Sequence, residues 1–103
     1  MKLLTKDIIN KAKRQYNKGS DMEQNVVAKF FNPSGRGTWY LMNMHDDEDY
    51  CWGICHINEW EIGSFSIKEL ESIRLPWGLK IERDRMFSPI KASKLWGRLN
   101  GVS

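Results

Sequence analysis

Hydrophobic residues change their spacing within Glu61–Leu70, and this change predicts a strand that runs directly into a helix. The alternation over Trp60–Ser64 is typical of a half-buried strand, whereas apolar residues after Ser66 recur at helical spacing. Ser66 and Glu69 have the spacing of a capping box, in which a serine at the helix start bonds the backbone of the third helical residue. The buried face of this helix is formed by Ile67, Leu70 and Ile73. Pro76 is expected to end it.

An earlier helix is predicted near the start of the chain, because apolar residues recur there with a helical period. They are Leu4, Ile8, Ile9, Ala12 and Tyr16. Thr5 is suited to cap the N-terminus of this helix, and Gly19 is suited to the left-handed position that ends it. The opposite face is basic and consists of Lys6, Lys11, Lys13, Arg14 and Lys18.

Three strands are predicted after this first helix. Gln24–Asn32 is rich in β-forming residues, and the turn cluster Asn32–Gly37 connects it to a second strand at Thr38–Met44. The charged segment His45–Asp49 is expected to be a loop, and Tyr50–Ile57 the third strand. Short loops between neighbouring strands favour antiparallel pairing.

The third strand places its two cysteines on one face. Side chains alternate along a strand, so Cys51 and Cys55 are expected about 13 Å apart on the same side, too far for a disulfide. We therefore expect free thiols, which fit a reducing cytoplasm. Gly53 between them predicts a β-bulge or the close approach of another backbone.

The last third of the chain adds a short extended piece and a helix. Leu79–Glu82 is expected to be a fifth strand or an extended segment, and Pro89 to lie in the first turn of the last helix. That helix carries Leu95, Trp96 and Leu99. A chain of 103 residues fits a single domain, residues 1–103. The predicted fold class is α+β: an antiparallel sheet of three to five strands packed by two or three helices, grouped on one face.

Charge is distributed unevenly. The net charge is +5 over residues 1–20, −6 over residues 21–65 and +4 over residues 66–103, for a total of +3. Such a dipolar surface suits a charged partner without distinguishing nucleic acid from protein. The start of the chain lacks the apolar run of a signal peptide, and no segment approaches the ~20 apolar residues of a membrane span. We expect a cytoplasmic protein without a membrane partner.

Short motifs spread over most of the chain carry a resemblance to a known family. They are residues 1–6 (MKLLTK), 27–33 (VAKFFNP), 38–40 (TWY), 52–53 (WG), 61–66 (EIGSFS), 69–70 (EL) and 81–84 (IERD). In this order and spacing they resemble a family of small bacterial and phage proteins known only as a domain of unknown function, number 2958. Its members are often carried on plasmids and integrated elements. The resemblance implies an accessory protein of a mobile element and brings no catalytic residues with it.

The loop before the third strand holds four consecutive acids, Asp46, Asp47, Glu48 and Asp49. Carboxylates suit calcium or magnesium, but the run lacks the spaced ligands and central glycine of a calcium loop. A solvated acidic loop is therefore the favoured interpretation, and such a loop could instead meet a basic surface on a partner protein.

Cys51, Cys55 and His56 are a weak candidate for zinc, because the sequence offers no second ligand pair and His56 faces away from the cysteines on a strand. Neither cysteine has a nearby Lys or Arg in sequence that would lower its pKa and activate it as a nucleophile. Buried thiols are the favoured interpretation.

Glu59, Glu61 and Asp84 would suit general acid–base catalysis only if two of them converged in a cleft, and a small enzyme using Glu61 and Asp84 is the weakest hypothesis. The alternating charges of Glu82–Arg85 favour ion pairs within the protein, or a loop pinned to the sheet by Arg83 and Asp84. The glycine-rich turn at residues 32–37 matches no phosphate-binding pattern. We expect no enzymatic activity, no cofactor and no metal.

The five tryptophans are more than one small core needs. Two or three are expected in the core, whereas Trp60 or Trp77, which lie beside charged or turn residues, is expected to be exposed. An exposed tryptophan is a common hot spot of protein–protein binding.

The leading hypothesis is a non-enzymatic protein-interaction module of a mobile element. In its sharper form the protein inhibits a host defence system such as a CRISPR or restriction nuclease, through Asp46–Asp49 together with Trp60 or Trp77. The alternative is a nucleic-acid-binding accessory protein that uses the basic face of the first helix, through charge and base stacking.

Overall fold

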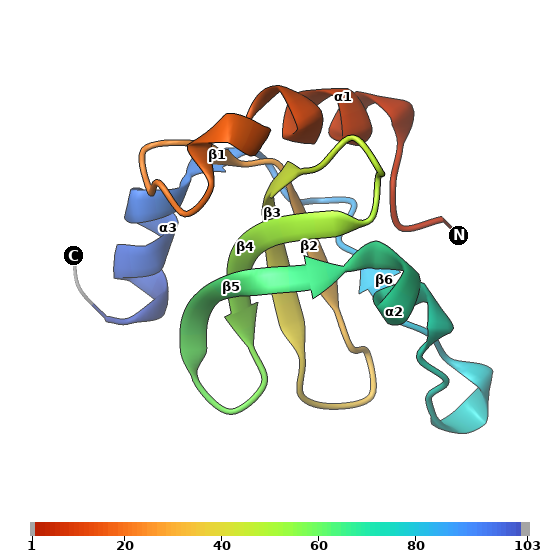
Figure 1. The fold of residues 1–103 in the computed structure, drawn as a ribbon. Helices are drawn as coiled ribbons and strands as arrows, with labels where there is room; N and C mark the ends of the chain where they lie inside the picture. The colour runs from red at the N-terminus through yellow and green to blue at the C-terminus, as the bar shows by residue number, and fades with distance from the viewer. Residues whose placement is uncertain (1, 102–103) are drawn as a thin grey trace.

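The computed structural model describes residues 2–101 (Figure 1). In chain order the elements are α1 Lys6–Arg14, the 3₁₀ helix η1 Tyr16–Lys18, β1 Asn25–Val26, β2 Ala28–Phe31, β3 Thr38–Met44, β4 Tyr50–His56, β5 Trp60–Ser66, α2 Ile67–Ser72, the 3₁₀ helix η2 Pro76–Gly78, β6 Glu82–Arg83, β7 Ile90–Lys91 and α3 Ala92–Leu99. Across these described residues no helix is long and apolar enough to cross a membrane.

The main sheet has the strand order β5-β4-β3-β2-β6, and every neighbouring pair is antiparallel. Short loops connect β2, β3, β4 and β5 in succession, so these strands pair with their neighbours in sequence. The chain then returns to the far edge, where β6 pairs with β2, and β1 pairs with β7 in a separate two-stranded sheet. The α+β class and the antiparallel sheet predicted from the sequence are confirmed.

Both faces of the main sheet are covered by helices. One core cluster joins the sheet to α1 and α2, and its members include Ala12, Phe30, Leu41, Cys51 and Leu70. The other cluster joins the sheet to α3, and its members include Tyr40, Met42, Ile54, Ala92 and Leu95. Alternation along β3 and β4 sends neighbouring side chains into the two clusters, so both strands are apolar on both sides.

The expectation that the helices share one face is therefore wrong for α3. The pairing of β7 with β1 sets the direction in which the chain enters this helix. The backbone N–H groups of Ala92 and Ser93 donate to the carbonyl oxygens of Gln24 and Met22, both at 2.8 Å. These bonds hold the start of α3 beside β1, on the side of the sheet opposite α1 and α2 (Figure 1).

Gly53 marks the close approach of another backbone, as predicted: the Tyr40 carbonyl oxygen lies so close that a Cβ atom at Gly53 would overlap it. Only glycine fits this position, because the obstacle is backbone and cannot move aside. A β-bulge is also present, but it lies in the facing strand, where the register of β3 against β4 shifts between Leu41 and Asn43.

Several predicted boundaries differ from the structure. Helix α1 ends at Arg14, and Gly19 instead follows the separate 3₁₀ helix η1. Pro89 precedes β7 and does not open α3, because the two residues after it pair with β1. The predicted first strand is divided at Val27 into β1 and β2, which belong to different sheets. Helix α2 ends at Ser72, before Pro76 is reached, and of Leu79–Glu82 only the last residue lies in a strand.

Candidate functional site

Asp49 caps helix α2. Its Oδ1 atom accepts hydrogen bonds from the Ser66 hydroxyl and from the Lys68 backbone N–H, both at 2.8 Å. The Ser66 hydroxyl oxygen in turn accepts a bond from the Glu69 N–H at 3.2 Å, which confirms the predicted N-cap. A carboxylate in this position is favoured by the positive end of the helix dipole.

The other acids of the loop are also largely engaged within the protein. Asp47 Oδ1 accepts the backbone N–H groups of Tyr50 at 3.0 Å and Asp49 at 2.9 Å, and these bonds hold the pKa of Asp47 below its ordinary 3.8. The Glu48 carboxylate lies 2.7 Å from the ammonium of Lys13 on α1. Asp46 alone forms no hydrogen bond or ion pair with the part of the chain that the structure describes. The loop that was predicted to bind a partner thus mainly connects α1, β4 and α2 through hydrogen bonds and an ion pair.

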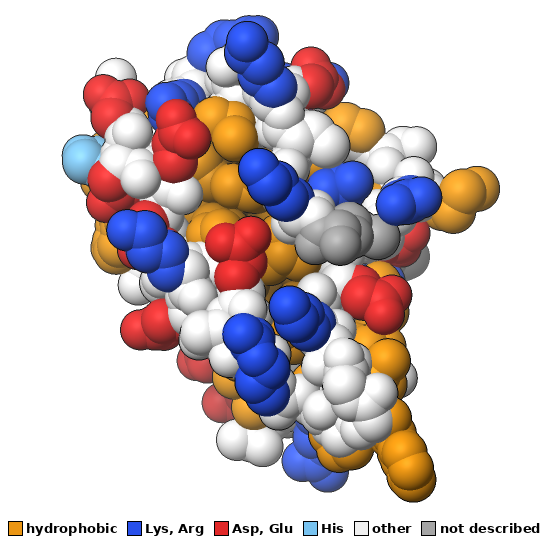
Figure 2. Space-filling view, turned by 90° about the vertical axis from the view of Figure 1, so that its right-hand side faces the viewer, with side chains coloured by type: hydrophobic (Ala, Val, Ile, Leu, Met, Phe, Trp, Pro, Cys, Tyr) orange, Lys and Arg blue, Asp and Glu red, His pale blue; other side chains and the backbone are white. Residues whose placement is uncertain are grey.

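The basic face of the first helix is partly neutralised as well. Lys11 pairs with Asp7 at 3.0 Å, and Lys13 with Glu48. The hydrogen bond to Glu48 raises the pKa of Lys13 above its ordinary 10.5. Between residues 2 and 101, the remaining three cations of this set have no ion-pair partner; they are Lys6, Arg14 and Lys18. Figure 2 shows Lys and Arg side chains interspersed with Asp and Glu over one face of the molecule.

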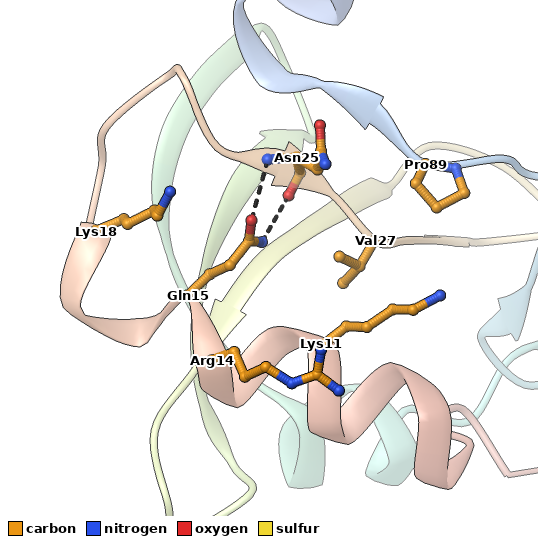
Figure 3. A pocket seen from close by; sticks show the side chains of 7 residues that line it. All are labelled: Lys11, Arg14, Gln15, Lys18, Asn25, Val27 and Pro89. Carbon is orange, nitrogen blue, oxygen red and sulfur yellow. Dashed lines mark hydrogen bonds between the residues drawn. The ribbon is translucent and has the colours of Figure 1, made fainter.

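A pocket of about 470 Å³ opens between α1 and β1 (Figure 3). Its lining residues are Lys11, Arg14, Gln15, Lys18, Asn25, Val27 and Pro89. The Gln15 amide closes one wall, because its Nε2 donates to the Asn25 carbonyl oxygen at 2.9 Å and its Oε1 accepts the Asn25 N–H at 3.2 Å. Three cations surround apolar surface from Val27 and Pro89, and no acidic side chain lines the pocket.

A smaller pocket of about 210 Å³ continues this hollow toward the segment after β6, and the two share Lys11, Val27 and Pro89. Here the charges are mixed, because Asp7 and Asp84 line it beside two arginines. The two hollows form a groove along one side of α1, basic at one end and mixed at the other.

The prediction that Arg83 and Asp84 pin a loop to the sheet is confirmed. Arg83 Nη1 donates to the carbonyl oxygens of Lys2 and Leu3 at 2.8 and 2.9 Å, which ties the start of the chain to β6. The Asp84 carboxylate lies 3.8 Å from Lys29 of β2, and its Oδ1 accepts the Met86 N–H at 2.9 Å.

Four of the five tryptophans pack against the core. Trp39 is buried, and Trp52, Trp60 and Trp96 are partly buried against the cluster beneath α3. The ring of Trp60 lies 4.5 Å from that of His56 and 5.8 Å from that of Tyr40, between ring centroids. The sequence predicts that either Trp60 or Trp77 is exposed, and Trp60 is not the exposed one.

Trp77 is 96% exposed and is held on a tight turn. The Leu75 N–H donates to the Leu79 carbonyl oxygen at 3.0 Å, and the Leu79 N–H donates to the Pro76 carbonyl oxygen at 3.2 Å. The backbone of Trp77 has φ 65°, a left-handed conformation that is uncommon for a bulky residue. Figure 1 shows this turn, η2, projecting away from the sheet. We call Leu75–Leu79 the Trp77 turn.

The thiols are free, as predicted, and both face the cluster beneath α1 and α2. Burial raises the pKa of Cys51 and of Cys55 to about 12, so neither is a nucleophile near neutral pH. His56 points to the opposite face, where it packs on Trp60. Residues 2–101 contain no group of three or more His, Cys, Asp or Glu side chains arranged to hold a metal ion.

Glu61 and Asp84 do not converge. Glu61 lies on β5, and Asp84 follows β6, so the two are at opposite edges of the main sheet. Four strand spacings separate these edges, or about 19 Å. The acid–base pair considered from the sequence is therefore wrong.

Sequence reasoning missed the pocket and the conformation of the Trp77 turn. The pocket needs Pro89 beside α1, a contact between distant segments that no local pattern predicts. The turn had a local signal in Pro76, Trp77 and Gly78, because proline and glycine flanking one residue mark a tight turn.

In a comparison with known protein families, residues 2–99 match the family described as "Protein of unknown function (DUF2958)". Comparisons with curated proteins and with solved structures give no significant match.

Proposed function

The chain belongs to the DUF2958 family, and since that family's function is unknown, we propose a function from this chain's own surface: it is a non-enzymatic module that binds another protein. The observation that carries the proposal is the exposure of Trp77. A tryptophan left in water on a projecting turn gains nothing for folding, whereas in an interface it would bury about 150–250 Å².

The geometry of the Trp77 turn supports this function. Backbone hydrogen bonds on both sides of Trp77 hold the turn in shape, and with it the direction of the Trp77 Cα–Cβ bond, before any partner arrives. A preformed turn loses little conformational entropy on binding. Non-glycine residues in the left-handed region cost roughly 1–3 kcal/mol and are concentrated at functional sites. Together these features fit a binding hot spot better than a passive loop.

The proposal also extends to the class of protein that is bound. The resemblance to proteins carried on plasmids and integrated elements favours a protein of the host or of the element, and its sharpest form is inhibition of a defence nuclease of the CRISPR or restriction type. The free thiols of Cys51 and Cys55 fit action in a reducing cytoplasm. Asp46 is the acid of the loop that remains available to a basic partner surface.

The proposal is tested by affinity capture from host lysate, in which the amount of partner retained by each variant is measured. The immobilised protein is compared with Trp77→Ala and with Met86→Ala, a matched control because Met86 is also an apolar side chain in water, at 89% exposure. A stoichiometric partner retained by wild type and Met86→Ala but not by Trp77→Ala supports the proposal. Equal capture by all three, or no stoichiometric partner, argues against it.

A second candidate, nucleic-acid binding, is favoured by the cations of the pocket. Lys11, Arg14 and Lys18 surround an apolar floor that no acidic residue lines, which suits a phosphate beside a base, and of the three only Lys11 is ion-paired, with Asp7. Asp7 and Asp84 in the neighbouring hollow, and the pairing of Lys13, weaken the positive field. These charges therefore favour contact with a few nucleotides at the pocket over binding of a long nucleic-acid segment along α1.

Salt-dependent binding to an oligonucleotide tests this second candidate. Replacing Arg14 and Lys18 by alanine is expected to lower the slope of affinity against salt by about one for each phosphate that is no longer neutralised. Lys94→Ala/Arg98→Ala on α3 removes the same charge outside the pocket and serves as the control. Absence of binding at low salt, or an equal decrease in both double variants, rules the pocket out as a nucleic-acid site.

A further inference from the structure

Strand β5 is a long, open edge of the main sheet. It lies at one end of the strand order and spans Trp60–Ser66, whereas the opposite edge strand, β6, has only two residues. Figure 1 shows no helix or strand along the free side of β5. A row of unpaired backbone groups on such an edge is a template for another strand.

The hydrogen bonds identify which backbone groups point outward. The His45 N–H donates to the Tyr50 carbonyl oxygen, so the backbone of Tyr50 faces β3 and that of Cys51, next along β4, faces β5. Cys51 is paired with Phe65, and the Ile67 N–H donates to the Asp49 carbonyl oxygen at 3.0 Å. Alternating from these positions, the N–H and C=O groups of Ile62 and Ser64 point away from β4.

The usual devices that protect a sheet edge are missing from β5. The strand contains no proline and no lysine, and its pairing with β4 is continuous over all seven residues, without a bulge. Glu61 is its single charged residue. At the midpoint, Gly63 has open space beside it, since a Cβ atom there would meet nothing within 4 Å.

We propose that β5 pairs antiparallel with β5 of a second copy of this chain, about a two-fold axis at Gly63. This register is the one that overlaps the whole strand. It places Ile62 opposite Ser64 of the second copy, so the two residues exchange both backbone hydrogen bonds. Glu61 then faces Phe65 of the second copy, and the two Glu61 carboxylates are not opposite each other.

The side chains fit this arrangement. The two Gly63 residues form a non-hydrogen-bonded pair, where the backbones approach most closely, and they bring no side chain into the gap. Charge repulsion across the axis is avoided, and β-branched Ile62 lies beside a small serine. The interface uses neither the Trp77 turn nor the pocket, so it is independent of the function proposed above.

The test is the oligomeric state of the intact protein, measured by sedimentation equilibrium over a wide concentration range. Wild type is expected to be a reversible dimer. Ser64→Pro removes an outward N–H that the monomer does not use, and proline is tolerated at such edge positions. This variant is expected to be a monomer, and Ser64→Thr, its matched control, a dimer.

A second variant covers the case in which proline disturbs folding. Gly63→Arg has room for its side chain in the monomer but places two like charges opposite each other at the axis. Its dimer is expected to dissociate up to about fivefold more readily. A wild type that stays monomeric at high concentration, or a dimer unaffected by Gly63→Arg, overturns the proposal. A monomer that instead takes up an extended peptide at β5 also contradicts it.

Discussion

The Glu48 carboxylate lies 2.7 Å from the Lys13 ammonium, and this contact joins the two charged sets that the sequence offered as rival binding surfaces. Each partly neutralises the other. The acidic loop and the basic helix therefore contribute to the fold before they contribute to binding. What remains available for recognition is smaller: Trp77, Asp46 and the cations of the pocket.

Asp49→Ala is expected to destabilise the protein by about 1–2 kcal/mol, because it removes the acceptor of two hydrogen bonds at the start of α2. Asp46→Ala in the same loop is the control and should leave the free energy of unfolding unchanged. Urea denaturation followed by circular dichroism measures both. Equal stability of the two variants would show that the Asp49 cap is not stabilising.

Gly53→Ala is expected to cost about 3 kcal/mol or more, because its Cβ atom would overlap the Tyr40 carbonyl oxygen within the sheet. Gly63→Ala is the matched control on the adjacent strand, where the added methyl group meets open space. Its stability should stay within about 0.5 kcal/mol of wild type when measured on dilute protein. Thermal unfolding of the two variants side by side checks this expectation, and similar losses of stability would contradict it.

The two thiols predict a decline of stability at alkaline pH. Burial raises their pKa to about 12 in the folded protein, against an ordinary value of 9.0. Above pH 9 the unfolded chain loses thiol protons that the folded chain keeps, so their contribution is full below pH 9 and is lost as pH rises toward 12. Replacing both cysteines with alanine should flatten this part of the pH–stability profile. An unchanged slope would indicate that the thiols are not protected by folding.

Trp77→Gly is expected to leave the free energy of unfolding unchanged or to raise it by up to about 1 kcal/mol. The indole makes no contribution to the core, and glycine adopts φ 65° without steric cost. Trp60→Gly is the contrasting change, because that ring packs on Tyr40 and His56, and it should be clearly destabilising. A large loss of stability on replacing Trp77 would mean that the turn supports the fold.

Local patterns predicted the elements well wherever a side chain and its own backbone decide the structure. The Ser66 cap, the strand Thr38–Met44 and the close approach at Gly53 all follow from neighbours in sequence. Each of these features is fixed by steric or hydrogen-bonding demands of a few residues, which a single sequence displays.

The parts that failed depend on contacts between distant segments. Pro89 fits a helix start by its local properties, but pairing of the following residues with β1 makes them a strand. The acids at positions 46–48 are exposed, as predicted, but the sequence could not show that acids of this loop also bond within the protein, because the partners Lys13 and Ser66 lie far away in sequence. Trp60 is less exposed than Trp77 because it packs against Tyr40, a contact that no local pattern in the sequence contains.

The central claim is that Trp77, and not the acidic loop, carries protein recognition. The most direct measurement is the dissociation constant of the captured partner for wild type, Trp77→Ala and Asp46→Lys. We predict at least about a 30-fold loss of affinity for Trp77→Ala, the equivalent of a 2 kcal/mol hot spot, and a smaller change for Asp46→Lys. A partner that binds Trp77→Ala as tightly as wild type, while Asp46→Lys abolishes binding, would contradict the account.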